Sequence, residues 1–316
     1  MPGTSIIIPT HERPHLLGRA VESARRAGSN VEIVVVDDGS VDETREVCAG
    51  LPDIVYVRLD RQHGVGFARN AGIEASSQAY ISFLDDDDIR LPGSIDRQVA
   101  VLESSPGAAM VYGQALGATQ RLEVNGRVHP SFCPTGDVFW RLLTRNFIPA
   151  ITTVIRRSVL ACVGGGPRQD CAPADDWDLW LRIAQHHPLA ALAEPVAIYR
   201  EPTLWSNQGS SQATDLVPAA LRVIERSALL PRVMANPAAF RRATSLIKQR
   251  MADRLLFEAV GAARAGDAYT LASVRCAIRS VPQAVLRDVL TPRMWQHFWY
   301  ALKGDDVAAA VQRAAG

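Results

Sequence analysis

The chain has 316 residues, 47% of them hydrophobic and 21% charged, which is enough for a sizeable buried core and one or two domains. Its formal net charge of +1 argues against general nucleic-acid binding, which needs a basic surface to neutralise phosphates. Five cysteines without a CxxC pair indicate reduced thiols. No stretch reaches the roughly 20 apolar residues of a membrane-spanning helix. We therefore expect a cytoplasmic protein, with peripheral membrane attachment left open.

The first hundred residues alternate between short apolar runs and segments with helical spacing. Strands are predicted at 5–8, 31–36, 54–59 and 80–84, and helices at 14–27, from about 41, at 65–75 and from about 92. Ser40 and Glu43 have the spacing of a capping box at the start of the second helix. This alternation predicts a parallel sheet with helices on its faces, and such sheets bind ligands at the carboxyl ends of their strands.

The pattern is weaker after about residue 110. Strands are predicted at 111–115, 151–155 and 189–199, a hairpin around Asn125-Gly126, and a helix at 176–186. From about residue 210 the chain is rich in Ala, Leu and Arg, and we expect it to be helical.

Acidic clusters follow two of the predicted strands. Asp85–Asp88 come directly after the fourth strand, and Asp37 and Asp38 after the second. Four adjacent carboxylates repel one another, so a cation or full solvation must stabilise them. Oxygen ligands suit Mg²⁺ or Mn²⁺, and the place at a strand end favours a ligand site over a solvated loop. Asp38 could accept hydrogen bonds from a base or a ribose hydroxyl.

Two further motifs leave alternatives open. Near the start of the helix at 65–75, Arg69 could approach a diphosphate or pair with one of the loop aspartates. Asp175 or Asp176 could cap a later helix, whose dipole is expected to keep the pKa of Asp176 low.

Five segments occur in a characteristic order: SIIIPT at 5–10, VVVDDGS at 34–40, GFARNAGI at 66–73, YISFLDDDD at 80–88 and DDWDLWLR at 175–182. Together they resemble the family 2 glycosyltransferases with the GT-A fold, over residues 4 to about 200. The resemblance implies an α/β, mostly parallel sheet flanked by helices. It divides the chain into a nucleotide-sugar-binding half at 1–110, an acceptor-binding half at 111–205 and a C-terminal helical region at 206–316.

The resemblance also implies the chemistry and the residues that perform it. The donor would be a nucleotide-diphosphate sugar, in the first place a UDP-sugar, the cofactor Mg²⁺ or Mn²⁺, and the reaction an inverting transfer to a glycan, lipid-linked or small-molecule acceptor. The nucleotide-sugar-binding residues would be Pro9, His11, Asp38, Arg69, Asp85 and Asp86, the metal ligand Asp87, and the general base Asp176. We interpret Trp177 and Trp180 as packing residues or platforms for an acceptor sugar. Two departures from the family pattern concern the acceptor loop: Gly164–Gln169 replaces the usual Gly-Gly-Phe-Asp-Glu, and Asp175 replaces a Glu.

Other interpretations remain open at this point. An inactive nucleotide-sugar-binding protein could share the fold, and a nucleotidyltransferase also uses acids on a parallel sheet. The C-terminal segments 216–230, 240–265, 269–281 and the aromatic run 295–300 could form a helical subdomain, a homodimer interface or a membrane-surface attachment.

Overall fold

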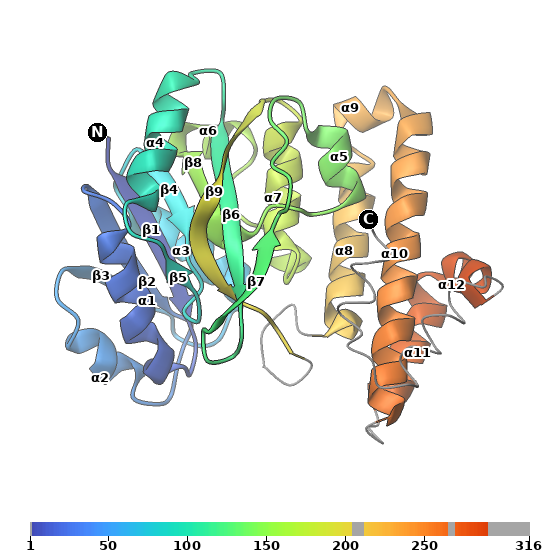
Figure 1. Ribbon diagram of the computed structural model, residues 1–316, viewed down its shortest axis with the longest axis horizontal. Coiled ribbons are helices and arrows are strands. Elements are labelled where there is room, and N and C mark those ends of the chain that lie inside the picture. The colour runs from blue at the N-terminus through green and yellow to red at the C-terminus, as the bar shows by residue number, and fades with distance from the viewer. Residues whose placement is uncertain (1, 204–211, 265–268, 290–316) are drawn as a thin grey trace. The chain divides into compact units, whose positions relative to one another are not determined.

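The computed structural model describes residues 2–203, 212–264 and 269–289 (Figure 1). The chain divides into two units, Met1–Gln208 and Gly209–Gly316. The strands of the first unit are β1 Thr4–Thr10, β2 Val31–Asp37, β3 Ile54–Arg58, β4 Tyr80–Phe83, β5 Ile89–Arg90, β6 Met110–Ala118, β7 Val124–His129, β8 Thr153–Arg156 and β9 Leu189–Arg200. Its helices are α1 Pro14–Arg26, α2 Thr44–Ala49, α3 Val65–Ala75, α4 Ser94–Ser104, α5 Phe139–Thr144, α6 Arg157–Cys162 and α7 Asp175–Ala184, with short 3-10 turns at Ala150–Thr152 and Gln169–Cys171.

One nine-stranded sheet organises the first unit, in the order β3-β2-β1-β4-β8-β6-β9-β5, with β7 paired to β6 (Figure 1). Strands β3, β2, β1 and β4 pair in parallel, as the alternation of strands and helices predicted. Beyond β4 the sheet is mixed, because β8 runs antiparallel to both β4 and β6 while β6 and β9 are parallel. The parallel half therefore carries the strand ends at which the acidic clusters were predicted.

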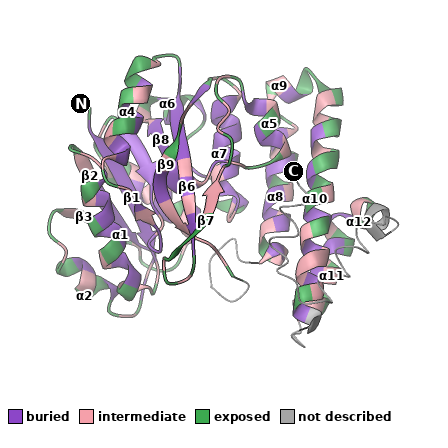
Figure 2. Cartoon of the chain, viewed as in Figure 1, coloured by how far each residue is buried: buried purple, intermediate pink, exposed green. Residues whose placement is uncertain are grey.

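Helices cover both faces of the parallel half. Ile6 and Ile8 of β1 lie in one core with α1 and α4, while Ile7 faces the other side, where a Cβ on Gly72 of α3 would come within 2.3 Å of it. Every residue of β1 is consequently buried (Figure 2). A strand buried on both faces explains the unbroken apolar run at 5–8.

Two local predictions from the sequence are wrong. Helix α2 begins at Thr44 rather than near 41, because the Ser40 hydroxyl accepts a hydrogen bond from Glu12 N instead of capping the helix. The β6–β7 hairpin turns at 119–123, where Thr119 N donates to Glu123 O, and Asn125-Gly126 lies inside β7. In both places a contact outside the short motif decides the backbone conformation.

The second unit is helical where it is described. Its helices are α8 Ala213–Ser227, α9 Pro231–Met234, α10 Pro237–Arg264, α11 Tyr269–Ser280 and α12 Pro282–Val289. They confirm the helices predicted at 216–230, 240–265 and 269–281, whereas the aromatic run at 295–300 lies outside the described residues. Across the described ranges, no helix combines the length and apolarity required to cross a bilayer.

Candidate active site

The acidic loop Asp85–Asp88 leaves the carboxyl end of β4. Leu84 N still donates to Ile7 O of β1, and Asp88 N donates to Asp85 O at 3.1 Å, which closes a tight turn. The side chain of Asp85 is 35% exposed, whereas those of Asp86 and Asp87 are at most 5% exposed. The turn therefore presents Asp85 outward and directs its neighbours into the protein.

Asp86 is held by residues that follow β1. Thr10 Oγ1 donates to Asp86 Oδ2 at 2.7 Å, and Arg13 Nη1 donates to Asp86 Oδ1 at 3.2 Å. Burial raises the pKa of Asp86, and the Arg13 charge acts in the opposite direction. Both oxygens of Asp86 are thus engaged inside the protein, so Asp85 is the better placed of the two candidates for a ribose contact.

Asp87 and Asp88 meet a second arginine at the end of β9. Arg13 and Arg200 lie 3.2 Å and 3.6 Å from Asp87 Oδ2, and Arg200 N donates to Asp88 Oδ1. Burial, together with the charges of Asp85 and Asp86, raises the pKa of Asp87 to about 7. Asp88 Oδ2 is buried and accepts no hydrogen bond from the described residues.

The carboxylate of Asp38 fixes the segment that leads into α3. Its Oδ1 accepts from His63 N and its Oδ2 from Gly64 N, both at 2.7 Å. Each oxygen keeps a second acceptor position, so the predicted contact with a nucleotide base stays a prediction. Pro9 is buried in β1, and His11 follows the strand with its Nδ1 buried and without a hydrogen bond among the described residues.

Arg69 joins the acidic loop to the start of α7. Its Nη2 donates to Asp85 Oδ1 at 2.8 Å and its Nη1 to Asp175 Oδ2 at 2.9 Å. Although burial alone would lower it, the neighbouring carboxylates raise the pKa of Arg69. The ion-pair alternative for Arg69 is therefore confirmed, and its approach to a diphosphate stays a prediction.

Close packing of small residues joins α3 to the segment that precedes α7. A Cβ on Gly66 would lie 3.1 Å from Gln169 Cα, and a Cβ on Gly166 would lie 2.3 Å from Asn70 Oδ1. Asn70 Nδ2 also donates to Pro167 O at 2.6 Å. The Gly164–Gln169 segment, which departs from the family pattern, thus fits the surface of α3 and sets the distance over which Arg69 reaches α7.

Asp176 occupies the second position of α7 and is only partly enclosed. The residue preceding the helix is Ala174, so neither Asp175 nor Asp176 is the N-cap. Asp176 Oδ1 accepts from Trp177 N at 2.6 Å, and Asn146 Nδ2 lies 3.3 Å from both carboxylate oxygens.

The pKa of Asp176 corrects the expectation from the helix dipole. Burial and the charge of Asp175 raise this pKa to about 7, against the opposing effects of Arg69, the Trp177 N–H and Asn146. The dipole argument failed because the loss of solvation and a like charge outweigh it. A carboxyl group that titrates near neutrality is suited to accept a proton.

Two tryptophans and one arginine fix α7 in place. Trp177 Nε1 donates to Leu142 O and Trp180 Nε1 to Ile148 O, and both rings are buried. They are therefore packing residues, which was one of the two interpretations drawn from the sequence. Arg182 pairs with Asp178 at 2.8 Å and donates to the carbonyl groups of Gly165 and Gly166. These contacts hold the helix that carries Asp176.

The oxygen atoms of the acidic loop are compatible with the predicted Mg²⁺ or Mn²⁺ site, which substrate phosphates would complete. Such a cation commonly takes one or two carboxylates and several further oxygens. Asp87, the predicted ligand, lies beside Arg13 and Arg200, and Asp88 Oδ2 is a buried acceptor that the described residues leave without a hydrogen bond. The described residues contain no group of three His, Cys, Asp or Glu side chains arranged around a common point, so an all-protein site is not formed there.

The contacts connect most of the predicted site residues. Asp86 and Asp87 share Arg13, Asp85 shares Arg69 with Asp175, and Asp176 follows Asp175 directly. Pro9 and His11 lie at the same strand edge, and among the described residues their side chains form no hydrogen bond or ion pair with the others. The sequence analysis missed the partners that hold the carboxylates, which are Thr10, Arg13, Asn146 and Arg200. Of these four, only Arg13 could have been suspected from the sequence, because it is a cation that follows the first predicted strand at the edge where the aspartates were expected.

The sheet flanked by helices, the carboxylates at the ends of β2 and β4 and the acidic start of α7 form the arrangement that the resemblance to GT-A glycosyltransferases implied. The model of Glycosyl transferase family 2 matches residues 5–164, and the chain belongs to this family. The membership confirms the predicted enzyme class against the nucleotidyltransferase alternative.

Two curated relatives carry the name of a glycosyltransferase or glucosyltransferase. The chain is 29% identical over 191 residues, 58% of its length and 70% of the other, to the amylovoran biosynthesis glycosyltransferase AmsE of Erwinia amylovora. It is 31% identical over 142 residues, 43% of its length and 44% of the other, to the GalNAc(5)-diNAcBac-PP-undecaprenol beta-1,3-glucosyltransferase of Campylobacter jejuni. The alignment to the succinoglycan biosynthesis protein ExoO of Rhizobium meliloti, 38% identical, covers 31% of this chain and 29% of that protein.

The fold is shared with a solved enzyme. The crystal structure of S. aureus TarS 1-349 in complex with UDP-GlcNAc superposes with a TM-score of 0.63 and 17% sequence identity, covering 96% of this chain and 88% of that one. At this identity the likeness concerns the fold, which confirms the prediction of GT-A architecture.

Proposed function

We propose that the chain transfers a sugar from a UDP-sugar to an acceptor hydroxyl, with inversion at the anomeric carbon. The observation that carries this proposal is Asp176, a carboxyl group whose pKa is raised to about 7 and which lies one residue from the ion pair that leads to the acidic loop. A donor-binding loop and a group able to accept a proton are thereby joined through one buried arginine, Arg69.

On the acceptor side, Asp176 would hold the acceptor hydroxyl through its ionised carboxylate. As the acceptor oxygen forms its bond to the anomeric carbon, the bond from that carbon to the phosphate oxygen breaks on the opposite face. The hydroxyl proton passes to Asp176, and the nucleoside diphosphate leaves with the electron pair of the broken bond. In-line displacement of this kind inverts the anomeric carbon.

On the donor side, Asp38 and Asp85 would bind the base and the ribose, and Arg69 the diphosphate. Asp87 would hold Mg²⁺ or Mn²⁺, whose chemistry when bound is to neutralise charge on the leaving diphosphate. Arg13 and Arg200 already lie beside Asp87 and limit repulsion between it and the phosphates.

The likeness to TarS, whose crystal structures contain UDP-GlcNAc and UDP, supports a uridine nucleotide. The names of the relatives, which include polysaccharide biosynthesis and a diphosphate-undecaprenol acceptor, support a glycan or lipid-linked acceptor. We place the enzyme in the cytoplasm, with peripheral attachment to the inner face of the membrane as part of the proposal.

The test is a screen of UDP-, GDP- and dTDP-sugars on the full chain, with thermal stability and release of nucleoside diphosphate as readouts. A UDP-sugar in the presence of Mn²⁺ is expected to stabilise the protein and to be slowly hydrolysed. EDTA or Asp87→Ala should abolish the hydrolysis with the fold intact. Stabilisation without release of diphosphate under any condition would favour the inactive binding protein, and full turnover in EDTA would remove the metal from the mechanism.

A further inference from the structure

The two units of the chain carry opposite net charges. Residues 1–208 contain 19 Lys and Arg against 25 Asp and Glu, a net charge of −6, whereas residues 209–316 contain 15 against 8, a net charge of +7. The near-neutral total of +1 hides this separation. A basic unit attached to an acidic one indicates that the basic unit meets an anion.

The positive charge of the second unit is concentrated on one segment of α10. Residues 241–250 include Arg241, Arg242, Lys248 and Arg250, all exposed, and no acidic residue. Among the described residues, neither Arg241 nor Lys248 has a carboxylate within ion-pair distance. No described carboxylate therefore compensates the charges of Arg241 and Lys248.

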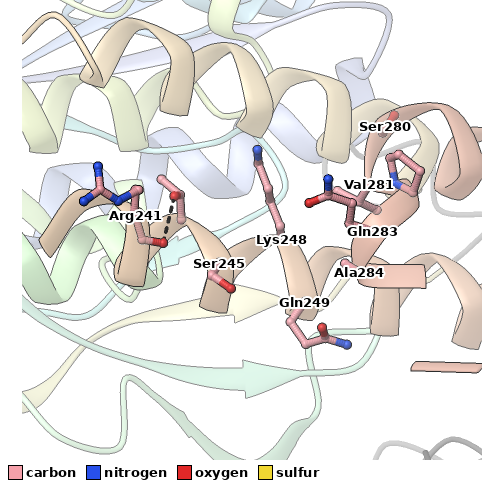
Figure 3. Close-up of a pocket in the computed structure, with 10 residues that line it drawn as sticks. Arg241, Ser245, Lys248, Gln249, Ser280, Val281, Gln283 and Ala284 are labelled. Atoms are coloured by element: carbon pink, nitrogen blue, oxygen red, sulfur yellow. Dashed lines mark hydrogen bonds between the residues drawn. The ribbon is translucent and has the colours of Figure 1, made fainter. Parts of the chain in front are cut away.

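A cavity of about 390 Å³ opens beside these cations, between α10 and the junction of α11 and α12 (Figure 3). Arg241 and Lys248 stand seven residues apart on the same face of α10, about 10 Å along its axis. The remaining lining residues supply hydroxyl and amide groups or short apolar side chains, and none is acidic: Thr244, Ser245, Gln249, Ser280, Val281, Pro282, Gln283 and Ala284. Thr244 uses its hydroxyl within α10, donating to Phe240 O at 2.9 Å and approaching Arg241 O at 3.2 Å.

We propose that this cavity binds a phosphate group. A guanidinium and an ammonium in its lining match the charge of a phosphate or diphosphate, and the arginine can bind two phosphate oxygens at once. Ser245 and Gln283 also line the cavity and carry hydrogen-bond donors. The first turn of α12 begins at Pro282 in the wall of the cavity, where the helix dipole also favours an anion.

The same chemistry could come from a soluble phosphate compound or from the headgroup of an anionic phospholipid. Two arms of one experiment on the full chain separate these sources. In the first, binding of inorganic phosphate and of pyrophosphate is measured by calorimetry. In the second, the chain is floated with vesicles of phosphatidylcholine alone or with phosphatidylglycerol added. Binding in either arm supports the site and names its source.

The decisive comparison is between two variants that lose the same charge from the same unit. The pocket variant is Arg241→Gln with Lys248→Gln, and the control is Arg242→Gln with Arg275→Gln, which are exposed residues outside the cavity lining. All four positions are exposed, so the melting temperature of both variants should stay close to that of the native chain. The pocket variant is expected to lose about tenfold or more of the affinity, because charged hydrogen bonds to the phosphate disappear.

Equal losses in the two variants would show that general attraction to the basic surface, and not the cavity, binds the anion, and would overturn the proposal. Absence of binding in both arms at millimolar phosphate and at excess lipid would overturn it as well. Because the readout is binding at the second unit, neither result depends on the transferase reaction proposed above.

Discussion

The loop Asp85–Asp88 and the start of α7, Asp175–Asp178, are both acidic and both contact Arg69, but their charges are compensated differently. In the loop, Arg13 and Arg200 lie beside Asp87, and Arg69 pairs with Asp85.

In the helix, Asp175 and Asp178 pair with Arg69 and Arg182, whereas Asp176 accepts hydrogen bonds from an amide and a backbone N–H and has no ion pair among the described residues. Residues of one type in one helical turn thus differ in their electrostatic environment because of what pairs with them. In α7 the acid without an ion pair is the one whose pKa is raised to about 7, whereas in the loop burial and two like charges raise the pKa of Asp87 to about 7 although two arginines lie beside it.

The largest expected effect comes from removing that acid. Asp176→Asn keeps the shape of the side chain, so donor binding and the melting temperature should stay unchanged. The turnover number should fall by about 10²–10⁴-fold, because the general base is lost. The measurement is release of nucleoside diphosphate with donor and acceptor both saturating.

The matched control is Asp178→Asn, which changes an ion-paired aspartate two positions after Asp176 in the same helix. It removes the partner of Arg182 and should lower the melting temperature while the folded enzyme keeps its turnover number. If Asp176→Asn turns over at the native rate, Asp176 is not the base and Asp175 becomes the residue to test.

The second effect concerns the arginine that the two acidic regions share. Arg69→Gln leaves Asp85 and the buried Asp175 without their cation, and breaking a buried ion pair typically costs about 3–5 kcal/mol of unfolding free energy. Urea denaturation measures this loss. Arg97→Gln is the control, because Arg97 pairs with Glu194 on the surface and should cost about 1 kcal/mol or less. Similar small losses in both variants would mean that Arg69 does not hold the two regions together.

The third effect is the dependence of activity on pH. The base works in its ionised form, so kcat/KM should fall as the pH drops below the pKa of Asp176, about 7, and level off above it. The slope below the midpoint should approach tenfold per pH unit. Residual activity of Asp176→Asn should lose the contribution of Asp176 to this inflection, and any inflection that remains near pH 7 is assigned to Asp87, whose pKa is also raised to about 7. A native profile that stays flat from pH 6 to 8 would contradict the raised pKa of Asp176.

The sequence predicted the parallel half of the sheet well, for a physical reason. Strands buried on both faces favour continuous β-branched runs, and the runs at 6–8 and 33–36 within the predicted strands have no competing interpretation. The capping box at Ser40 failed because Glu12, a neighbour in space, uses the Ser40 hydroxyl. Where the local sequence pattern is weak, contacts between residues distant in the sequence determine the backbone conformation, and the sequence alone does not reveal those contacts.

In the candidate site, too, local sequence patterns could be recognised and contacts between distant residues could not. Asp38, the loop aspartates and Asp176 were identifiable, because carboxylates at strand and helix ends form a local pattern. Their partners were not, since Arg13 lies 73 residues from Asp86, and Arg200 lies 112 residues from Asp88. The raised pKa of Asp176 was missed for a related reason: it depends on burial, which only the assembled fold creates.

The smallest expected effect concerns Asn146, the uncharged side chain that contacts Asp176. Asn146 Nδ2 lies 3.3 Å from both oxygens of Asp176, and this contact lowers the pKa of the acid by favouring its ionised form. Asn146→Ala should therefore move the midpoint of the pH profile upward, by less than about one pH unit, with the turnover number at high pH retained. Asn146→Asp is the matched variant, because a second carboxylate at this distance should move the midpoint further in the same direction. A downward shift in either variant, at an unchanged melting temperature, would show that the midpoint belongs to a group other than Asp176.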